Sequence, residues 1–292
     1  MSSFKDLKAN RMNNLQSLTK QVEKLSEKPS YEDERIWKCE RDKTGNGYAV
    51  IRFLPAPTGE DVPWVRLWTH GFKGPGGWYI ENSLTTPRSG YPNGSDDPVS
   101  KANTVLWNSG IESDKNIARE RKRKLSYYSN ILVLEDSANA ENEGKVFLFR
   151  YGKKIFEKID SLMKPEFKDE EPMNPFDFWG GANFKLKIRQ VDGFANYDKS
   201  EFAAPSPLFD GDDAKLENIW QQQYSLQSIL APENFKSYQE LEARFNTVIA
   251  HDAGGEFVGT IEESTNDPVA SVDAAEKTSE DTLEYFKKLA EQ

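Results

Sequence analysis

Apolar and polar residues alternate with a period of two through most of the middle of this chain. The alternation covers residues 48–54, 64–72, 78–81, 126–135 and 145–151, and several of these segments are separated by glycine or proline. Successive side chains of a strand point to opposite faces of a sheet, so the pattern predicts short strands with one face on a core.

Residues 184–191 show the same pattern most clearly and predict a strand with one apolar and one cationic face. The apolar positions are Phe184, Leu186 and Ile188, and the cationic ones are Lys185, Lys187 and Arg189.

Helical spacing of apolar residues appears in four places, at residues 3–28, 153–163, 214–230 and 233–250. Residues 85–110 are rich in glycine and proline with little periodicity, which predicts a surface insertion. Strands and helices do not alternate regularly, so a doubly wound parallel sheet is not expected. The pattern predicts a mainly β protein with helical additions (α+β), built as a small twisted barrel.

The net charge of −10 is unevenly distributed along the chain. Residues 1–30 hold six bases and three acids, whereas residues 251–292 hold three bases and eleven acids. We therefore predict a basic N-terminal segment (1–30), a core (31–250) with an insertion at about 70–125, and an acidic, largely disordered tail (251–292). Such asymmetry favours a polyanionic partner and a tail that mimics it.

Several function classes lack the residues that they need. Cys39 is the one cysteine, and 18 consecutive apolar residues occur nowhere, which argues against disulfides and a membrane span. The two histidines, His70 and His251, lie in no nucleophile or metal motif, and no phosphate-binding loop is present. We expect a binding protein and not an enzyme, and an active site built from scattered carboxylates stays open as an alternative.

A run of four cations, Arg121 to Lys124, directly precedes a strand that carries Tyr127 and Tyr128. Cations neutralise phosphates, and flat rings stack on unpaired bases, each worth about 1–3 kcal/mol. The combination recurs at 149–154 and at 194–197. A single cluster is more simply explained as solvated surface and half-buried packing, but three in an acidic chain favour binding of single-stranded nucleic acid.

Long segments of the chain also resemble the single-stranded DNA-binding (helix-destabilising) proteins of T-even-like bacteriophages. The resembling segments are 45–55, 70–81, 122–136, 140–159 and 180–198, and together they cover most of residues 35–250. The resemblance implies an OB-like barrel with an inserted subdomain, and DNA bound in a cationic cleft between the two. It also implies a role in phage DNA replication, recombination and repair, in the cytoplasm of an infected bacterium.

The resemblance and the residue pattern together give a candidate DNA-binding set. Its members are Arg52, Arg121, Lys122, Arg123, Lys124, Tyr127, Tyr128, Phe149, Arg150, Tyr151, Lys185, Lys187, Phe194 and Tyr197. In the family, the N-terminal segment contacts the adjacent protomer along DNA, and here its cations are Lys5, Lys8 and Arg11, spread along the predicted helix. The family's acidic tail recruits replication and recombination proteins and competes with DNA for the cleft.

Family members often hold a structural zinc ion in the insertion through one histidine and three cysteines. His70 matches the histidine, but Ser83, Asp97 and Ser100 stand where the cysteines would be. Serine is a poor zinc ligand, and one histidine with one carboxylate falls short of a closed tetrahedral site. We therefore predict no metal and no cofactor, with His70 an ordinary polar strand residue.

Two alternative functions stay open at this point. One is a single-stranded RNA binder that represses translation, because stacking alone rarely excludes RNA. The other is a structural adaptor protein that works through its acidic tail, with solvated basic clusters. Neither alternative involves a membrane.

Overall fold

The structure is a computed structural model that describes residues 33–167 and 169–250. The helix predicted at 3–28, the contact residues Lys5, Lys8 and Arg11, and the acidic tail lie outside the described residues. The chain divides into two compact units, residues 1–36 and 37–292. In the described part of the first unit, residues 33–36, Arg35 forms an ion pair with Asp33 at 2.6 Å.

The described residues form nine strands, five α-helices and four short 3-10 helices. The strands are β1 (Ile36–Trp37), β2 (Gly47–Phe53), β3 (Val65–Gly74), β4 (Gly77–Asn82), β5 (Lys124–Asp136), β6 (Val146–Tyr151), β7 (Ala182–Val191), β8 (Phe194–Asn196) and β9 (Glu201–Pro205). The α-helices are α3 (Pro98–Asn108), α4 (Glu112–Glu120), α5 (Lys153–Met163), α6 (Asp213–Gln221) and α7 (Tyr238–Ile249). The 3-10 helices are η1 (Ala140–Asn142), η2 (Leu208–Gly211), η3 (Leu226–Leu230) and η4 (Pro232–Asn234).

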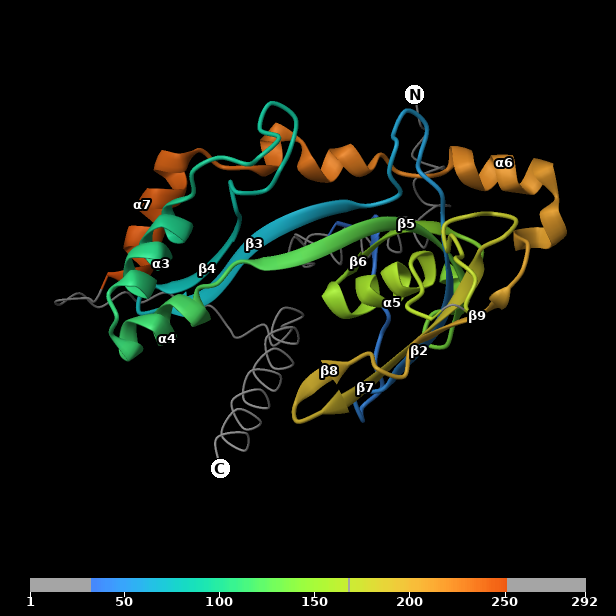
Figure 1. The fold of residues 1–292 in the computed structure, drawn as a ribbon, viewed down its shortest axis with the longest axis horizontal. Coiled ribbons are helices and arrows are strands. Elements are labelled where there is room, and N and C mark those ends of the chain that lie inside the picture. Colours follow the sequence, from blue (N-terminus) through green and yellow to red (C-terminus); the bar gives the residue numbers. More distant parts are fainter. Residues whose placement is uncertain (1–32, 168, 251–292) are drawn as a thin grey trace, which may run out of the picture. The chain divides into compact units, whose positions relative to one another are not determined.

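Strand β5 organises the antiparallel sheet (Figure 1). Its first residues pair with β3, its middle pairs with β6, and its last residues pair with β2. Strand β2 also pairs with β7, which carries β8 and β9, and β3 pairs with β4. The fold is mainly β with helical additions, as the sequence pattern predicted.

The main core lies where β2, β5, β6 and β7 face helix α5. Phe53 is fully buried at its centre and contacts the rings of Phe149, Tyr151, Phe176, Phe184 and Phe202. Strand β7 shows the predicted alternation, because Phe184, Leu186 and Ile188 are buried while the lysines between them are half-buried.

The predicted insertion has a separate core that also includes the C-terminal helix α7. Phe72 and Tyr79, on β3 and β4, pack against Phe245 of α7, with ring centroids 6.2 and 6.1 Å from that ring. Periodicity predicted a helix at 233–250 but did not show that it packs against the insertion. Helix α7 starts later, at Tyr238, because Ser237 and Glu240 form a capping box.

Residues 85–110 differ from their prediction as an irregular insertion, because they contain helix α3. Asp97 caps this helix and Pro98 occupies its first turn, a combination that favours a helix start. Most of the helix is not buried, so apolar periodicity gave no signal there. The helix predicted at 214–230 was also too long: α6 ends at Gln221, and the side-chain amide of Asn130 binds both the backbone NH and the carbonyl of Tyr224.

No helix among the described residues is long and apolar enough to span a lipid bilayer.

Replacing Phe53 with Ala is expected to destabilise the protein by about 3–5 kcal/mol, because the truncation leaves a cavity among five rings. Urea unfolding followed by fluorescence measures the change. Phe167→Ala is the control, since Phe167 is 66% exposed, and it is expected to change stability by less than about 0.5 kcal/mol. Equal effects of the two changes would contradict this assignment of the core.

Candidate nucleic-acid interface

The four cations Arg121 to Lys124, called here the basic segment, connect the end of α4 to the start of β5. The guanidinium of Arg123 lies 4.3 Å from the ring centroid of Trp68 on β3 and donates a hydrogen bond to Thr85 Oγ1. Lys122 is exposed, and Lys124 is half-buried at the first position of β5. The basic segment thus combines positive charge with a half-exposed flat ring.

Arg121 packs against two aromatic rings of the insertion core. Its guanidinium lies 5.6 Å from the ring centroids of both Phe72 and Phe245, and burial lowers its pKa. The Arg121 carbonyl accepts a hydrogen bond from His70 Nδ1 at 2.9 Å. These contacts tie Arg121 to the core of the insertion, so it anchors the basic segment in addition to contributing charge.

A second group of cations lies on α5 and the β7–β8 hairpin. It consists of Lys154 and Lys158 on α5 and of Lys185 and Lys187 on β7. A hydrogen bond from Asn196, together with the charges of Lys154 and Lys158, lowers the pKa of Asp198. The Lys158 ammonium also donates to the Asp198 carbonyl at 3.2 Å. Phe194, at the start of β8, is 37% exposed and gives this group its accessible ring.

Two of these cations, Lys185 and Lys187, belong to the predicted DNA-binding set, and so does Tyr197 after β8. Tyr197 is half-buried against the main core, and burial raises its pKa. Lys185 and Lys187 are half-buried on the cationic face of β7, and Lys187 forms an ion pair with Glu201 at 2.7 Å. These residues keep a surface position that is compatible with the predicted binding role.

The structure corrects the prediction for four aromatic residues. Tyr127, Tyr128, Phe149 and Tyr151 are all buried, with at most 7% of their surface exposed. Tyr127 stacks on Phe156 at a centroid distance of 4.0 Å, and the Tyr151 hydroxyl forms a hydrogen bond with Ser129. Their faces are taken up by packing inside the protein, so they are not presented to bases.

Arg52 is also corrected, because its side chain is fully buried. Its Nη2 donates to the carbonyls of Asp177, Phe178 and Ser206 at 2.8, 3.3 and 3.0 Å. Arg52 therefore fastens the chain before β7 and the chain after β9 to β2, and it has no surface left for a phosphate. Arg150 is half-buried and donates from Nε to Ser126 Oγ at 3.0 Å.

Trp68 is a candidate that sequence analysis missed. It lies in the alternating segment 64–72, but the sequence does not show which residue faces it. Pairing of β3 with β5 places Trp68 opposite Leu125, two residues after Arg123, and so beneath that guanidinium. Trp68 could have been identified only from the register between β3 and β5, two strands that lie about 60 residues apart in the sequence.

The four residues considered as zinc positions come together in one buried cluster. His70 Nε2 lies 3.2 Å from Asp97 Oδ1, and Ser83 Oγ donates to Asp97 Oδ2 at 3.0 Å. The Ser100 NH donates to Asp97 Oδ1 at 2.9 Å, and its hydroxyl lies 3.4 Å from His70 Nε2. His70 and Asp97 are 1% and 2% exposed. His70 is therefore a buried, paired residue, which corrects its prediction as an ordinary polar strand residue.

This cluster does not fit a zinc ion. His70 Nδ1 donates to the Arg121 carbonyl, and its Nε2 faces the Asp97 carboxylate at 3.2 Å, so both ring nitrogens are directed at protein groups. The remaining groups are one carboxylate and two neutral hydroxyls, which do not make a tetrahedral zinc site. Among the described residues, no group of three or more His, Cys, Asp or Glu side chains is arranged to hold a metal.

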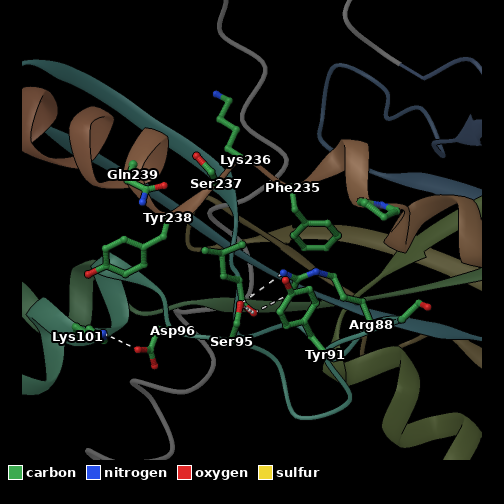
Figure 2. Close-up of a pocket in the computed structure, with 13 residues that line it drawn as sticks. Arg88, Tyr91, Ser95, Asp96, Lys101, Phe235, Lys236, Ser237, Tyr238 and Gln239 are labelled. Carbon is green, nitrogen blue, oxygen red and sulfur yellow. Dashed lines mark hydrogen bonds and ion pairs between the residues drawn. The ribbon is translucent and has the colours of Figure 1, made fainter.

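A cavity of about 590 Å³ lies between the loop after β4 and the start of α7 (Figure 2). The guanidinium of Arg88 is sandwiched there between the rings of Tyr91 and Phe235, at 4.4 and 4.5 Å, and donates to the Leu84 and Thr86 carbonyls. Lys101 forms an ion pair with Asp96 at 2.6 Å. None of the predicted DNA-binding residues lines this cavity.

Replacing Arg52 with Met is expected to destabilise the protein by about 2–4 kcal/mol, because each of the three carbonyls that it binds loses a donor. Denaturant unfolding measures the loss. Lys215→Met is the control, since the Lys215 side chain is 64% exposed on α6, and little change is expected from it. An Arg52 variant as stable as the unchanged protein would contradict this structural role.

A family model described as gp32 DNA binding protein like matches residues 45–249. The chain is 38% identical over 247 residues to a protein of Enterobacteria phage T2 named single-stranded DNA-binding protein, covering 84% of this chain and 80% of the relative. It is 37% identical, with the same coverage, to the protein of that name from Enterobacteria phage T4. The chain therefore belongs to the family described as gp32 DNA binding protein like.

Proposed function

We propose that this protein binds single-stranded DNA with little sequence preference during phage DNA replication, and that it acts by binding and not by catalysis. The observation that carries the proposal is the stacking of Arg123 on Trp68 within the basic segment. Relatives of the chain that are 37–38% identical to it are named single-stranded DNA-binding proteins, which supports the same reading.

The proposed mechanism uses cations and rings that are accessible in the structure. Lys122 and Arg123 neutralise phosphates, and Trp68 and Phe194 offer flat surfaces to unstacked bases. Phosphate contacts and stacking carry little sequence information. Because the protein binds single strands, it shifts the melting of duplex DNA by mass action.

The proposed DNA path runs from the basic segment to the second group of cations. Tyr127 belongs to the main core, and Leu125, two residues before it on β5, packs against that core from its edge. Tyr197 and Phe156 pack against the same core from the β8 side and from α5. The two cationic groups therefore border one aromatic core, and a single strand that lies along it would meet both.

Finer features extend the proposal. The main core is proposed to be an OB-like barrel, supported by the pairing of β2 with both β5 and β7 and by the rings enclosed around Phe53. Residues 1–30, with Lys5, Lys8 and Arg11, are proposed to contact the next protomer on DNA. The tail at 251–292 is proposed to recruit replication, recombination and repair proteins in the infected cell.

Salt dependence tests the proposal directly. The logarithm of the association constant for poly-dT is expected to fall linearly with the logarithm of salt concentration, with a slope of about −0.7 for each phosphate neutralised. Arg123→Ala is expected to reduce the slope by about 0.7, and Trp68→Ala to weaken binding by about 1–3 kcal/mol. Tryptophan fluorescence titrations measure both effects.

Lys215→Ala is the matched control, because Lys215 is an exposed cation on α6, outside both cationic groups. It is expected to leave affinity and slope unchanged. Affinity for poly-dT that does not depend on salt, or equal losses from Arg123→Ala and Lys215→Ala, would contradict the proposed interface. Tighter binding of a matched RNA oligomer would favour the RNA-binding alternative.

Removal of residues 251–292 is expected to strengthen binding to poly-dT at low salt, because the tail carries eleven acids and three bases and competes with phosphates. The same titration compares the truncated and full chains. The difference is expected to shrink as salt screens the charges. Weaker binding by the truncated chain would show that the tail is part of the DNA site.

A further inference from the structure

The basic segment forms hydrogen bonds at two points with one cluster of polar residues, which consists of His70, Ser83, Thr85 and Asp97. The Arg121 carbonyl accepts from His70 Nδ1, and the Arg123 guanidinium donates to Thr85 Oγ1. Thr85 Oγ1 lies 3.0 Å from Ser83 Oγ, and both Ser83 and His70 reach Asp97. A continuous chain of hydrogen bonds thus runs from the backbone of Arg121 through Asp97 to the side chain of Arg123.

The direction of each hydrogen bond follows from which atoms carry hydrogens. The Ser83 hydroxyl gives its one hydrogen to Asp97, so Thr85 donates to Ser83 and Arg123 donates to Thr85. From the other side, His70 Nε2 lies 3.2 Å from the Asp97 carboxylate. The side-chain donors of Arg123, Thr85 and Ser83 are therefore aligned toward one carboxylate, an arrangement in which neighbouring hydrogen bonds strengthen one another.

Asp97 is fully paired in this position. Besides His70 and Ser83, it accepts hydrogen bonds from the backbone NH groups of Leu84 and Ser100, at 3.1 and 2.9 Å. Burial raises the pKa of Asp97, but its interaction with His70 and the hydrogen bonds from the Ser100 NH and the Ser83 hydroxyl more than compensate and lower it to about 2. A buried charge whose acceptor sites are all filled fixes its partners, because moving any of them leaves a buried polar group unpaired.

The cluster joins four parts of the insertion that are distant in sequence. His70 lies on β3, Ser83 and Thr85 lie in the loop after β4, Asp97 caps α3, and Arg121 follows α4. The same loop is closed by Gly94, whose φ of +73° suits glycine and where a Cβ atom would lie 2.3 Å from the Thr85 carbonyl oxygen. Thr85 is thereby held where its hydroxyl meets Arg123.

We propose that Thr85, Ser83, Asp97 and His70 are positioning residues for DNA binding, which hold the basic segment and the Arg123–Trp68 stack in a binding geometry without a metal ion. This inference rests on the proposed function. A metal would organise the same segments through coordination. Here one carboxylate organises them through hydrogen bonds, and the imidazole directs both of its nitrogens to protein acceptors.

Thr85→Val tests the positioning role, because it replaces the hydroxyl with a methyl group of similar size. We expect it to weaken binding to poly-dT about tenfold, the loss typical of one hydrogen bond to a charged group, and to reduce the salt slope by about 0.7 as Arg123 leaves its position. The midpoint of thermal unfolding is expected to change by less than about 3 °C. Thr85→Ser restores the hydroxyl and is expected to recover affinity to within about twofold.

Thr247→Val is the matched control. The hydroxyl of Thr247 donates to the Ala243 carbonyl on the exposed side of α7, which packs on the insertion, and it has no bond to the cluster. We expect wild-type affinity and slope from this variant. Equal effects of Thr85→Val and Thr247→Val, or failure of Thr85→Ser to restore binding, would overturn the proposal.

Asp97→Asn removes the charge on which the cluster converges. We expect a larger loss of affinity than in Thr85→Val and a salt slope reduced by at least as much, measured below the unfolding temperature of the variant. Wild-type slope in the folded variant would overturn the proposal. If Asp97→Asn does not fold, the Thr85 variants decide the matter, because Thr85 lies outside the buried part of the cluster.

The statement that the cluster works without a metal ion is tested on the unchanged protein, by its unfolding midpoint and its affinity for poly-dT. We expect the same unfolding midpoint and the same poly-dT affinity after treatment with EDTA as after addition of zinc. A midpoint raised by zinc and lowered by EDTA would overturn it. If the unchanged protein does not bind poly-dT at all, the proposed function fails; if it binds and the Thr85 and Asp97 variants bind equally well, only this inference fails.

Discussion

The pairing of β5 with three other strands is the constraint on which the rest of the structure depends. Its first residues pair with β3 and so belong to the insertion, whereas its later residues pair with β6 and β2 in the main core. One continuous backbone thus links the basic segment to the main core. The buried rings of Tyr127, Phe149 and Tyr151 hold this strand in register, and their packing explains why they do not serve as stacking surfaces.

The accessible chemistry lies beside this framework. Arg123 stacks on Trp68 where β3 and β5 leave the main core, and Phe194 lies exposed at the tip of the β7–β8 hairpin with cations nearby. Rings in the core supply stability, and rings at its border are available to a ligand. The distinction is one of burial and not of residue type, so similar aromatic and basic clusters in the sequence have different roles in the folded protein.

Buried polar residues join the segments of the insertion. A buried carboxylate would be costly if left unpaired, but Asp97 is surrounded by four polar partners from three segments of the chain. The cost of its burial is thereby offset, and the directionality of hydrogen bonds restricts the segments to one arrangement. An apolar core of Phe72, Tyr79 and Phe245 adds non-directional stability beneath it.

The sequence alone determined strands β2 to β7, helix α5, the two-faced character of β7 and the family resemblance, because these depend on local periodicity and contiguous segments. It also placed Arg121 to Lys124 next to a strand. Only the tertiary structure decided that Arg52 and Tyr127 are buried, that Trp68 lies under Arg123, and that His70, Ser83 and Asp97 form one cluster. Burial and strand register depend on residues far apart in the chain, and a local pattern does not specify which distant residue faces a given side chain.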